Sequence, residues 1–363
     1  MHVALVYNLK KDAPLSEETS GDPSSQNISD VSTQVRAQSK SADTYAEWDT
    51  IETITAVRDS LALYHSIEMI EANTDAFEKL RAAHPDIVFN IAEGWFGASR
   101  EAQIPAMLEM LQLPYSGSDP LTLAVCLDKS RAKEILSYYS IPTPKFFVLN
   151  SPDEIPTMPP FLPAMVKPLF EGSSKGIFNA SLVCSAAELR TQAANVLGSY
   201  DQPVLVEEYL PGREFTVAML GNGKDVRVLP IVEIKFDSLP AGVNPIYSYE
   251  AKWIWDEASN PLEIFECPAK LPPELKDEIE RICKETYNVL RCRDWSRIDV
   301  RCDAAGAPHI IEVNPLPGIL PNPEENSCYP KAARAAQISY QEMLNLVLDA
   351  ACKRQGLPER AKN

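Results

Sequence analysis

Short apolar runs alternate with helix-like segments in the first part of this chain, and that alternation limits its fold. Residues 3–7, 66–71 and 87–91 have the composition of strands, whereas the segments between them have helical character at 53–64 and 75–83. Strands and helices in this order build a parallel sheet flanked by helices. Such sheets bind ligands at the carboxyl ends of their strands, where the run 87–91 continues into Ala92-Glu93-Gly94. We therefore expect an α/β fold with a binding loop after residue 91.

Residues 11–44 interrupt the alternation. This stretch is rich in Ser, Asp, Thr and Gln and contains no aromatic residue. It has too little apolar surface to order itself by burial, so we interpret it as a polar insertion. A solvated loop is favoured over a functional lid.

Length and charge exclude several classes of protein. A chain of 363 residues is too long for one compact core, and its segments suggest units at 1–122, 123–214 and 215–363. The net charge of −17 argues against nucleic-acid and anionic membrane partners, which would be repelled. The eight cysteines form no C-x-x-C pair, and no apolar run approaches a membrane span of about 20 residues. These features favour a cytoplasmic protein with reduced thiols.

The segment from Val166 to Gly176 is a candidate phosphate-binding loop. Lys167 lies on a predicted strand and is followed by Glu-Gly-Ser-Ser-Lys-Gly, whose N–H and hydroxyl groups can bind phosphate oxygens. The spacing is not that of a P-loop. Taken alone, the segment is equally consistent with an ordinary hairpin turn.

Two later segments carry a candidate metal site. Asp299 belongs to Arg297-Ile-Asp299, and Glu312 and Asn314 belong to the run 311–318. Residues two apart on a strand point to the same face, so Arg297 shares a face with Asp299, and Glu312 shares one with Asn314. Oxygen ligands of this kind suit Mg²⁺ when phosphates complete the coordination, and an arginine beside them could stabilise developing negative charge. Two exposed strands with salt bridges are the alternative explanation.

A third segment, 204–214, could line an adenine pocket. It is an apolar strand that ends in Glu207, Glu208 and Tyr209 and leads through a loop to Glu214. Its backbone would contact the base edge and Glu214 the ribose hydroxyls. An edge strand with a turn would have the same composition.

In this order and at this separation, these segments resemble the ATP-grasp superfamily, and specifically its D-alanine–D-alanine ligase branch. The resemblance covers strand one and most of the chain from Ile87 to Leu348. The matching motifs lie at residues 113–118, 128–133, 166–176, 212–217, 249–252, 296–299, 312–314 and 338–340. It implies a Rossmann-like N-terminal domain followed by two α+β domains that clasp ATP.

The resemblance also implies roles for individual residues. Lys129 and Lys167 are similar to the family's ATP-phosphate lysines, and Ser173 and Ser174 to further ATP-binding residues. Ser173 and Lys252 are also similar to groups of its closing loops. The adenine and ribose contacts would come from Glu207, Glu208, Tyr209, Leu210 and Glu214. Asp299, Glu312 and Asn314 correspond to a site for two Mg²⁺ ions, with Mn²⁺ as an alternative. Arg297 and the Gly318 N–H would stabilise the oxyanion, and Ser327 would contact the acceptor carboxylate.

The implied reaction joins a small carboxylate, most often an amino acid, to a small amine through an acyl phosphate. Stabilisation of charge on phosphoryl and acyl oxygens would come from cations, and closing loops would exclude water. A homodimer is expected only through the resemblance. Two alternatives stay open. One is a ligase that makes a different dipeptide or a specialised-metabolite amide, and the other is a non-catalytic nucleotide-binding regulator.

The substrate end departs from the family pattern. A glycine-rich loop with an ammonium-binding glutamate is replaced by the polar insertion, where Glu17 or Glu18 is a weak substitute. The family's His-Gly is replaced by Glu93-Gly94, and the loop that follows carries Arg100 and Glu101. Trp253 stands where D-alanine–D-alanine ligases have tyrosine, and it lacks the phenol that links the closing loops. We therefore predict Glu93, Arg100 and Trp253 as substrate-selecting residues, with neutral drift as the alternative.

Overall fold

The N-terminal strands form a parallel sheet. The computed structural model describes residues 1–10, 47–239, 242–250 and 264–360, so the insertion at 11–44 lies outside the described residues. In this first sheet the strands run in the order β2-β1-β3, with Val3 paired to both Ile67 and Ile87. Its strands and surrounding helices are β1 (His2–Tyr7), α2 (Ile51–Ala62), β2 (Ser66–Glu71), α3 (Ala76–Ala83), β3 (Ile87–Asn90), α4 (Gln103–Met110) and α5 (Pro120–Leu127). The predicted parallel sheet flanked by helices is confirmed.

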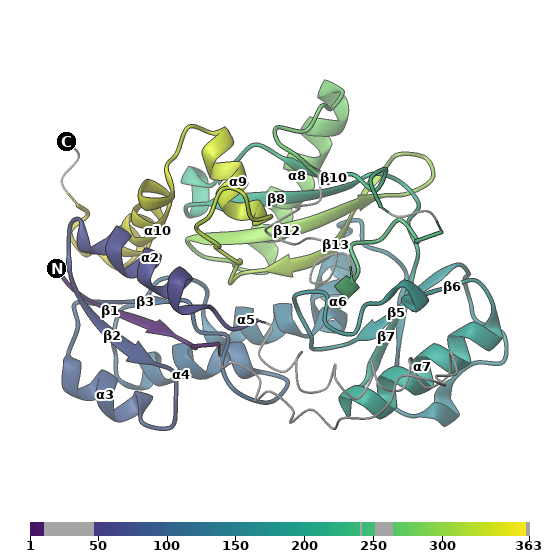
Figure 1. Cartoon of the computed structure of the whole chain (residues 1–363), viewed down its shortest axis with the longest axis horizontal. Coiled ribbons are helices and arrows are strands. Elements are labelled where there is room, and N and C mark those ends of the chain that lie inside the picture. Colours follow the sequence, from purple (N-terminus) through teal and green to yellow (C-terminus); the bar gives the residue numbers. More distant parts are fainter. Residues whose placement is uncertain (11–46, 240–241, 251–263, 361–363) are drawn as a thin grey trace, which may run out of the picture.

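A second, antiparallel sheet carries Lys167 and Glu207. Its strands run in the order β4-β7-β5-β6, and helices α6 and α7 pack beside it (Figure 1). The bounds are α6 (Lys129–Tyr138), β4 (Phe146–Leu149), β5 (Ala164–Pro168), β6 (Leu182–Val183), α7 (Ala186–Tyr200) and β7 (Val204–Glu208). The Asp128 carboxylate caps α6 by accepting from the N–H groups of Ser130 and Arg131 at 3.0 and 3.2 Å, as the sequence predicts.

One strand prediction in this region is confirmed only at its end. The sequence favours a strand over 177–183, but only Leu182–Val183 pairs as a strand, after a short 3₁₀ turn at Asn179–Ser181. The Ser181 hydroxyl accepts from the Phe178 N–H at 3.0 Å. A local side-chain bond of this kind stabilises a turn in competition with a strand ladder.

A third sheet, also antiparallel, is buried on both faces. Its strands run in the order β11-β10-β8-β12-β13, with β9 paired to β8. On β8, Val217 and Met219 pack in a cluster with residues of α8, whereas Ala218 and Leu220 pack in a cluster with residues of α9 and α10. The bounds are β8 (Glu214–Leu220), β9 (Arg227–Val228), β10 (Val232–Ile234), β11 (Phe265–Glu266), α8 (Pro273–Val289), β12 (Trp295–Cys302), β13 (Pro308–Asn314) and α9 (Cys328–Ala335). The remaining short 3₁₀ segments are Arg100–Ala102, Pro152–Glu154 and Gly223–Asp225.

The last helix returns to the first sheet. Helix α10 (Tyr340–Gln355) lies beside α2 in Figure 1, and the Asn345 side chain donates to the Ser60 carbonyl at 2.9 Å. The division into units at 1–122, 123–214 and 215–363 stays a prediction.

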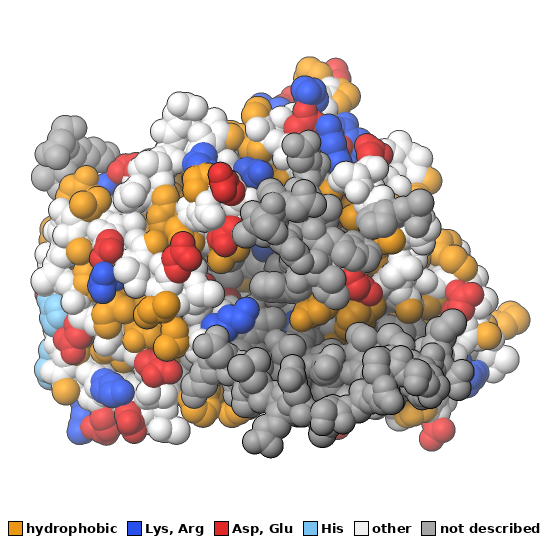
Figure 2. Space-filling view, viewed as in Figure 1, with side chains coloured by type: hydrophobic (Ala, Val, Ile, Leu, Met, Phe, Trp, Pro, Cys, Tyr) orange, Lys and Arg blue, Asp and Glu red, His pale blue; other side chains and the backbone are white. Residues whose placement is uncertain are grey.

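Surface charges pair with one another on α8. Arg281 contacts Glu278 and Glu285 at 2.6 and 2.7 Å, and blue and red side chains lie together near the top of Figure 2, where α8 is found. Among the described residues, no helix has both the length and the apolar character needed to cross a bilayer. The eight cysteines all fall within those residues, and none forms a disulfide.

Candidate active site

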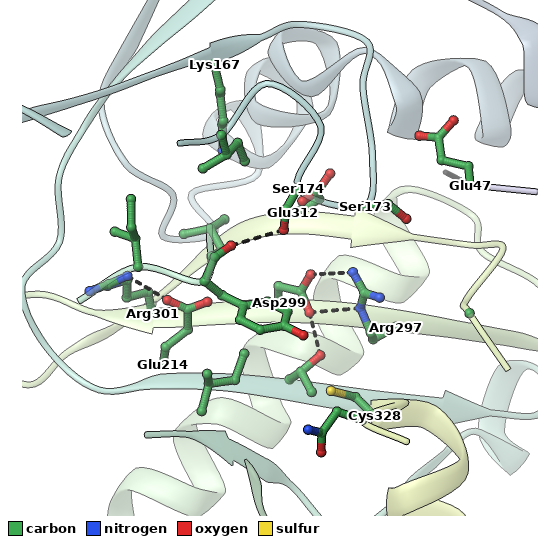
Figure 3. A pocket seen from close by; sticks show the side chains of 18 of the residues that line it. Glu47, Lys167, Ser173, Ser174, Glu214, Arg297, Asp299, Arg301, Glu312 and Cys328 are labelled. Atoms are coloured by element: carbon green, nitrogen blue, oxygen red, sulfur yellow. Dashed lines mark hydrogen bonds and ion pairs between the residues drawn. The ribbon is translucent and has the colours of Figure 1, made fainter. Parts of the chain in front are cut away.

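A cavity of about 260 Å³ is lined by the second and third sheets and by the segments that face them. A smaller cavity of about 90 Å³ shares part of its wall, including Ser173, Arg297, Glu312 and Gly318. Figure 3 shows Lys167 and the Ser173–Ser174 loop on one side of the larger cavity and the strands that carry Asp299 and Glu312 on the other. Predicted residues that line the larger cavity include Lys167, Ser173, Ser174, Glu207, Glu208, Tyr209, Leu210, Glu214, Arg297, Asp299, Glu312, Gly318 and Ser327.

The candidate metal ligands meet across two paired strands. In the register of β12 and β13, Arg297 lies opposite Asn314, and Asp299 lies opposite Glu312. Arg297 donates to the two Asp299 oxygens at 3.0 and 2.8 Å, and the Asn314 amide donates to Asp299 at 3.2 Å. Thr216 on β8 donates a further hydrogen bond to Asp299. The alternation predicted from the sequence therefore brings the side chains of β12 and β13 together on one face, namely Arg297, Asp299, Glu312 and Asn314.

A bulge in β13 adjusts this face. Asp299 pairs with Glu312 and Val300 pairs with Ile310, so Ile311 has no residue opposite it. In a regular strand, neighbouring residues point to opposite faces, yet Ile311 and Glu312 both line the larger cavity. Bulges of this kind re-aim side chains next to functional sites.

Three buried lysines contact two carboxylates that line the larger cavity. Lys129 contacts Glu312 at 2.9 Å, whereas Lys133 and Lys167 contact opposite oxygens of Glu207 at 2.9 and 2.5 Å. Burial alone would raise the pKa of Glu207, but Lys133 and Lys167 lower it to about 2. Burial opposes ionisation of Glu312 as well, but Lys129 and Lys167 hold its pKa below the ordinary value. Both carboxylates are therefore ionised at neutral pH.

Arg301 contacts two other residues that line the larger cavity. Its guanidinium contacts Glu214 at 2.6 Å (Figure 3) and donates to the Tyr209 hydroxyl at 3.0 Å. Burial raises the pKa of Glu214, and Arg301 partly offsets that rise. Arg301 was not among the predicted site residues, although it follows Asp299 by two positions on the same strand and so shares its face.

Ser173, Ser174 and Ser327 all line the larger cavity. Ser173 and Ser174 have φ angles of 51° and 61°, and the Ser174 hydroxyl donates to the Tyr247 carbonyl at 3.0 Å. The Ser327 hydroxyl donates to the Gly318 carbonyl at 3.1 Å, so the predicted acceptor-binding serine lies beside the residue predicted to stabilise the oxyanion. Lys252 and Trp253 lie outside the described residues.

The predicted substrate residues Glu93 and Arg100 lie in different surroundings. Glu93 lines the smaller cavity with Asp49 and Glu101, and burial together with the neighbouring carboxylates raises its pKa well above the ordinary value. Burial likewise raises the pKa values of Asp49 and Glu101 to about 7. Arg100 lines neither cavity, and it contacts Glu47 at 2.8 Å instead. Glu47 was missed because its partners are distant in sequence.

The residues present fit a divalent metal bound together with phosphate. Asp299 and Glu312 supply carboxylate oxygens and Asn314 an amide oxygen, which are the hard ligands that Mg²⁺ prefers. Asp299 lies in the middle of β12 opposite Glu312, and Asn314 is the last residue of β13. Lys129 and Arg297 offset part of the negative charge.

Comparisons with known proteins identify the family. The family described as "D-ala D-ala ligase C-terminus" matches residues 141–349. The D-alanine–D-alanine ligase of Bordetella avium is 35% identical over 285 residues, which are 78% of this chain and 83% of that protein. The uncharacterized protein y4sG of Sinorhizobium fredii is 37% identical over 268 residues, 74% of this chain and 75% of that protein.

A solved structure agrees at the level of the fold. The D-alanine–D-alanine ligase of Bacillus anthracis, crystallised with ATP, aligns over 98% of both chains with a TM-score of 0.67 and 23% identity. The chain therefore belongs to the D-alanine–D-alanine ligase family, a group of ATP-dependent carbon–nitrogen ligases with the ATP-grasp fold.

Proposed function

We propose that this protein joins two small amino acids in an ATP-dependent reaction, with D-alanyl-D-alanine as the first product to test. The observation that carries the proposal is the facing pair of strands that places Arg297, Asp299, Glu312 and Asn314 beside Lys129 and Lys167. Ligases of this family at 35% identity support the amino-acid substrates, and the ATP complex of the Bacillus anthracis enzyme supports the nucleotide.

The nucleotide is proposed to lie in the larger cavity. Met165, Ile177 and Leu210 give it apolar walls for a base, and Glu214 lies where it could accept from ribose hydroxyls. Lys129 and Lys167 and the loop at Ser173 would contact phosphate oxygens. Because Lys167 and Glu207 are paired at 2.5 Å, Glu207 would hold that lysine in place as well as line the base pocket.

Asp299, Glu312 and Asn314 are proposed to hold Mg²⁺. When bound, Mg²⁺ would neutralise phosphate charge and orient the phosphoryl group. Arg297 already donates to both oxygens of Asp299, so it fixes the carboxylate in the orientation that faces Glu312.

We infer a two-step acyl transfer in which the positive charge of Arg297 stabilises the negative charge that develops. A donor carboxylate takes the γ-phosphoryl group of ATP and releases ADP, and an acceptor amine then displaces phosphate to form the amide. Arg297 and the Gly318 N–H would stabilise the oxyanion formed when the amine attacks. The Ser327 hydroxyl, anchored on the Gly318 carbonyl, would place the acceptor carboxylate next to that position.

Phosphate release by the purified protein with Mg-ATP tests the proposal. D- and L-amino acids are supplied singly and in pairs, and products are identified by mass spectrometry. We expect release that depends on D-alanine and a product with the mass and stereochemistry of D-alanyl-D-alanine. Phosphate release with another pair of amino acids only would support the ligase activity and assign it different substrates. Nucleotide binding with no turnover over the whole panel would contradict the proposal and favour a regulator.

A further inference from the structure

Arg301 and Glu214 are a cross-strand pair in the third sheet. In the register of β12 and β8, Arg301 lies opposite Glu214, and Asp299 lies opposite Thr216. Residues two apart on a strand point to the same face, so the Arg301–Glu214 pair shares a face with the candidate metal ligand Asp299. All four residues line the larger cavity.

The carboxylate of Glu214 takes its orientation from Arg301. Nη1 of Arg301 donates to Oε2 of Glu214 at 2.6 Å (Figure 3), and no other residue in the described part of the chain donates a hydrogen bond to this carboxylate. The two side chains are 7% and 10% exposed, so little water competes for the contact. Burial raises the pKa of Glu214, and Arg301 partly offsets that rise, so the arginine also favours the charged form of the acceptor.

Arg301 restrains the surroundings of Glu214 as well. Its Nη2 donates to the Tyr209 hydroxyl at 3.0 Å and to the Pro245 carbonyl at 2.7 Å. The guanidinium carbon lies 4.9 Å from the ring centre of Tyr209 and 5.3 Å from that of Phe236, which is the range of a cation–π contact. Contacts on every side of the guanidinium therefore keep Arg301, and with it the Glu214 carboxylate, in one arrangement.

The second oxygen of Glu214 is the one left for a ligand. Oε2 is engaged by Arg301, whereas Oε1 accepts no hydrogen bond from the residues that the structure describes. A carboxylate oxygen accepts strongly from hydroxyl groups because the bond is charge-assisted. Since Arg301 already fixes the carboxylate, a hydroxyl that binds Oε1 has little side-chain freedom left to freeze.

We propose that Arg301 is a positioning residue for ribose recognition, which holds Glu214 so that its free oxygen accepts from a ribose hydroxyl of the nucleotide. The nucleotide in this cavity and its contact with Glu214 rest on the proposed function, and the dependence of that contact on Arg301 goes beyond it. A direct contact between Arg301 and the base is the competing role, because the buried Nε of Arg301 has no hydrogen-bond partner within the described residues.

Binding of Mg-ADP, 2′-deoxy-ADP and 3′-deoxy-ADP to the full chain tests the proposal. The native protein should bind ADP about tenfold more tightly than one of the deoxy analogues, the usual effect of one hydrogen bond to a charged group. Arg301→Met should reduce this ribose preference to about twofold or less, because the Glu214 carboxylate is no longer fixed. Arg301→Lys, which keeps the charge, should retain more of the preference than Arg301→Met.

Arg360→Met is the matched control. Arg360 is also a mostly buried arginine, with 9% of its side chain exposed, and it lies outside the larger cavity. It contacts Asp349 at 2.7 Å and lies 5.1 Å from the ring centre of Tyr64. Its replacement removes an ion pair and a ring contact of the same kind, so it should leave the ribose preference unchanged.

A double-variant cycle tests whether Arg301 acts through Glu214. Glu214→Gln alone should remove most of the ribose preference, and Arg301→Met should then add little to that loss. Equal losses caused by Arg301→Met in the native and Glu214→Gln backgrounds would contradict the proposed dependence. Arg301→Met that weakens ADP and both deoxy analogues by the same factor, and alters the preference for ADP over GDP, would overturn the proposal in favour of base contact.

Kinetics separate ribose positioning from damage to the metal site two residues away. Arg301→Met should raise the KM for ATP about tenfold with kcat nearly unchanged, because the ribose contact is made equally in the ground and transition states. A fall in kcat at an unchanged KM for ATP would overturn the proposal.

Failure of this inference and failure of the proposed function give different results. A native protein that binds none of the nucleotides would overturn the proposed nucleotide site and the role of Arg301 with it. Native binding that prefers ADP over a deoxy analogue, with the same preference in Arg301→Met, would overturn the role of Arg301 alone.

Discussion

Glu312 belongs to an ion pair and to the candidate metal site at once. Its carboxylate contacts Lys129 at 2.9 Å and lies opposite Asp299 across the strand pair. Ionisation of Glu312 depends on Lys129 and Lys167, since burial opposes it. A neutral side chain of the same shape would therefore remove negative charge from the site and leave Lys129 without its carboxylate partner.

Glu312→Gln should lower kcat for phosphate release by about 10²–10³-fold, the usual effect of removing one group that organises transition-state charge. The far-ultraviolet circular dichroism should stay unchanged, because the substitution keeps the shape of the side chain. Activity within a factor of two of the native protein would remove Glu312 from the metal site.

Site residues that are close in sequence could be predicted, whereas residues joined by long-range contacts could not. Arg297, Asp299, Glu312 and Asn314 could be grouped because strand alternation relates residues two apart. Glu47 could not be found, since its contact with Gly172 joins positions 125 residues apart. Arg301 was missed although the same alternation applied to it.

At the scale of elements, one ion cluster joins a helix to a sheet. Lys133 on α6 and Lys167 on β5 both contact Glu207 on β7. The cluster is nearly buried, with 2%, 6% and 6% of the three side chains exposed. Removing the anion from such a cluster leaves two cations without compensation.

Glu207→Gln should lower the free energy of unfolding at pH 7 by about 3–5 kcal/mol. The folded-state pKa of Glu207, about 2, is depressed from its ordinary 4.5, so its stabilisation is present above pH 4.5 and lost as pH falls toward 2. Urea unfolding as a function of pH should show this acid-dependent loss in the native protein and less of it in the variant. Identical pH profiles would contradict the assigned ion cluster.

The start of α10 allows a simpler prediction. The Ser339 hydroxyl accepts from the Glu342 N–H at 3.1 Å, as the sequence predicts. Ser339→Ala should lower the free energy of unfolding by about 1 kcal/mol without changing the KM for ATP. A midpoint of urea unfolding equal to that of the native protein would show that the cap contributes nothing.

Helix starts were predicted more reliably than short strands for a physical reason. The caps at Asp128 and Ser339 and the proline that opens α8 act within one turn of chain, so the sequence contains them entirely. The segment 177–183 failed because its turn depends on Ser181 and because the Tyr249 N–H bonds the Ile177 carbonyl. Contacts with a distant loop are not visible in a local pattern.

For the whole molecule, Asp294 connects four regions of the chain. This fully buried carboxylate accepts from the Gly117 N–H at 2.8 Å, the Asn222 amide at 2.6 Å and Arg354 at 2.8 Å. Arg354 also donates to the Tyr115 carbonyl at 2.9 Å. The first sheet, the third sheet and α10 are thereby held together at one point.

Asp294→Asn should lower the free energy of unfolding by about 3–5 kcal/mol, because it leaves Arg354 partly buried without an anion. Asp225→Asn, which alters an exposed pair with Lys353, is the control and should change the melting temperature little. Equal melting temperatures for the two variants would show that Asp294 does not hold the regions together.

The pairing of β12 with β13 also limits how this enzyme can change in evolution. A deletion of Val313 would place Glu312 and Asn314 on opposite faces of the sheet, so they could no longer contribute to one site. A length change in the turn between β12 and β13, at residues 303–307, would leave the register intact. Substrate preference in this lineage should therefore diverge by substitution within the strands, with insertions and deletions accumulating only in the connections.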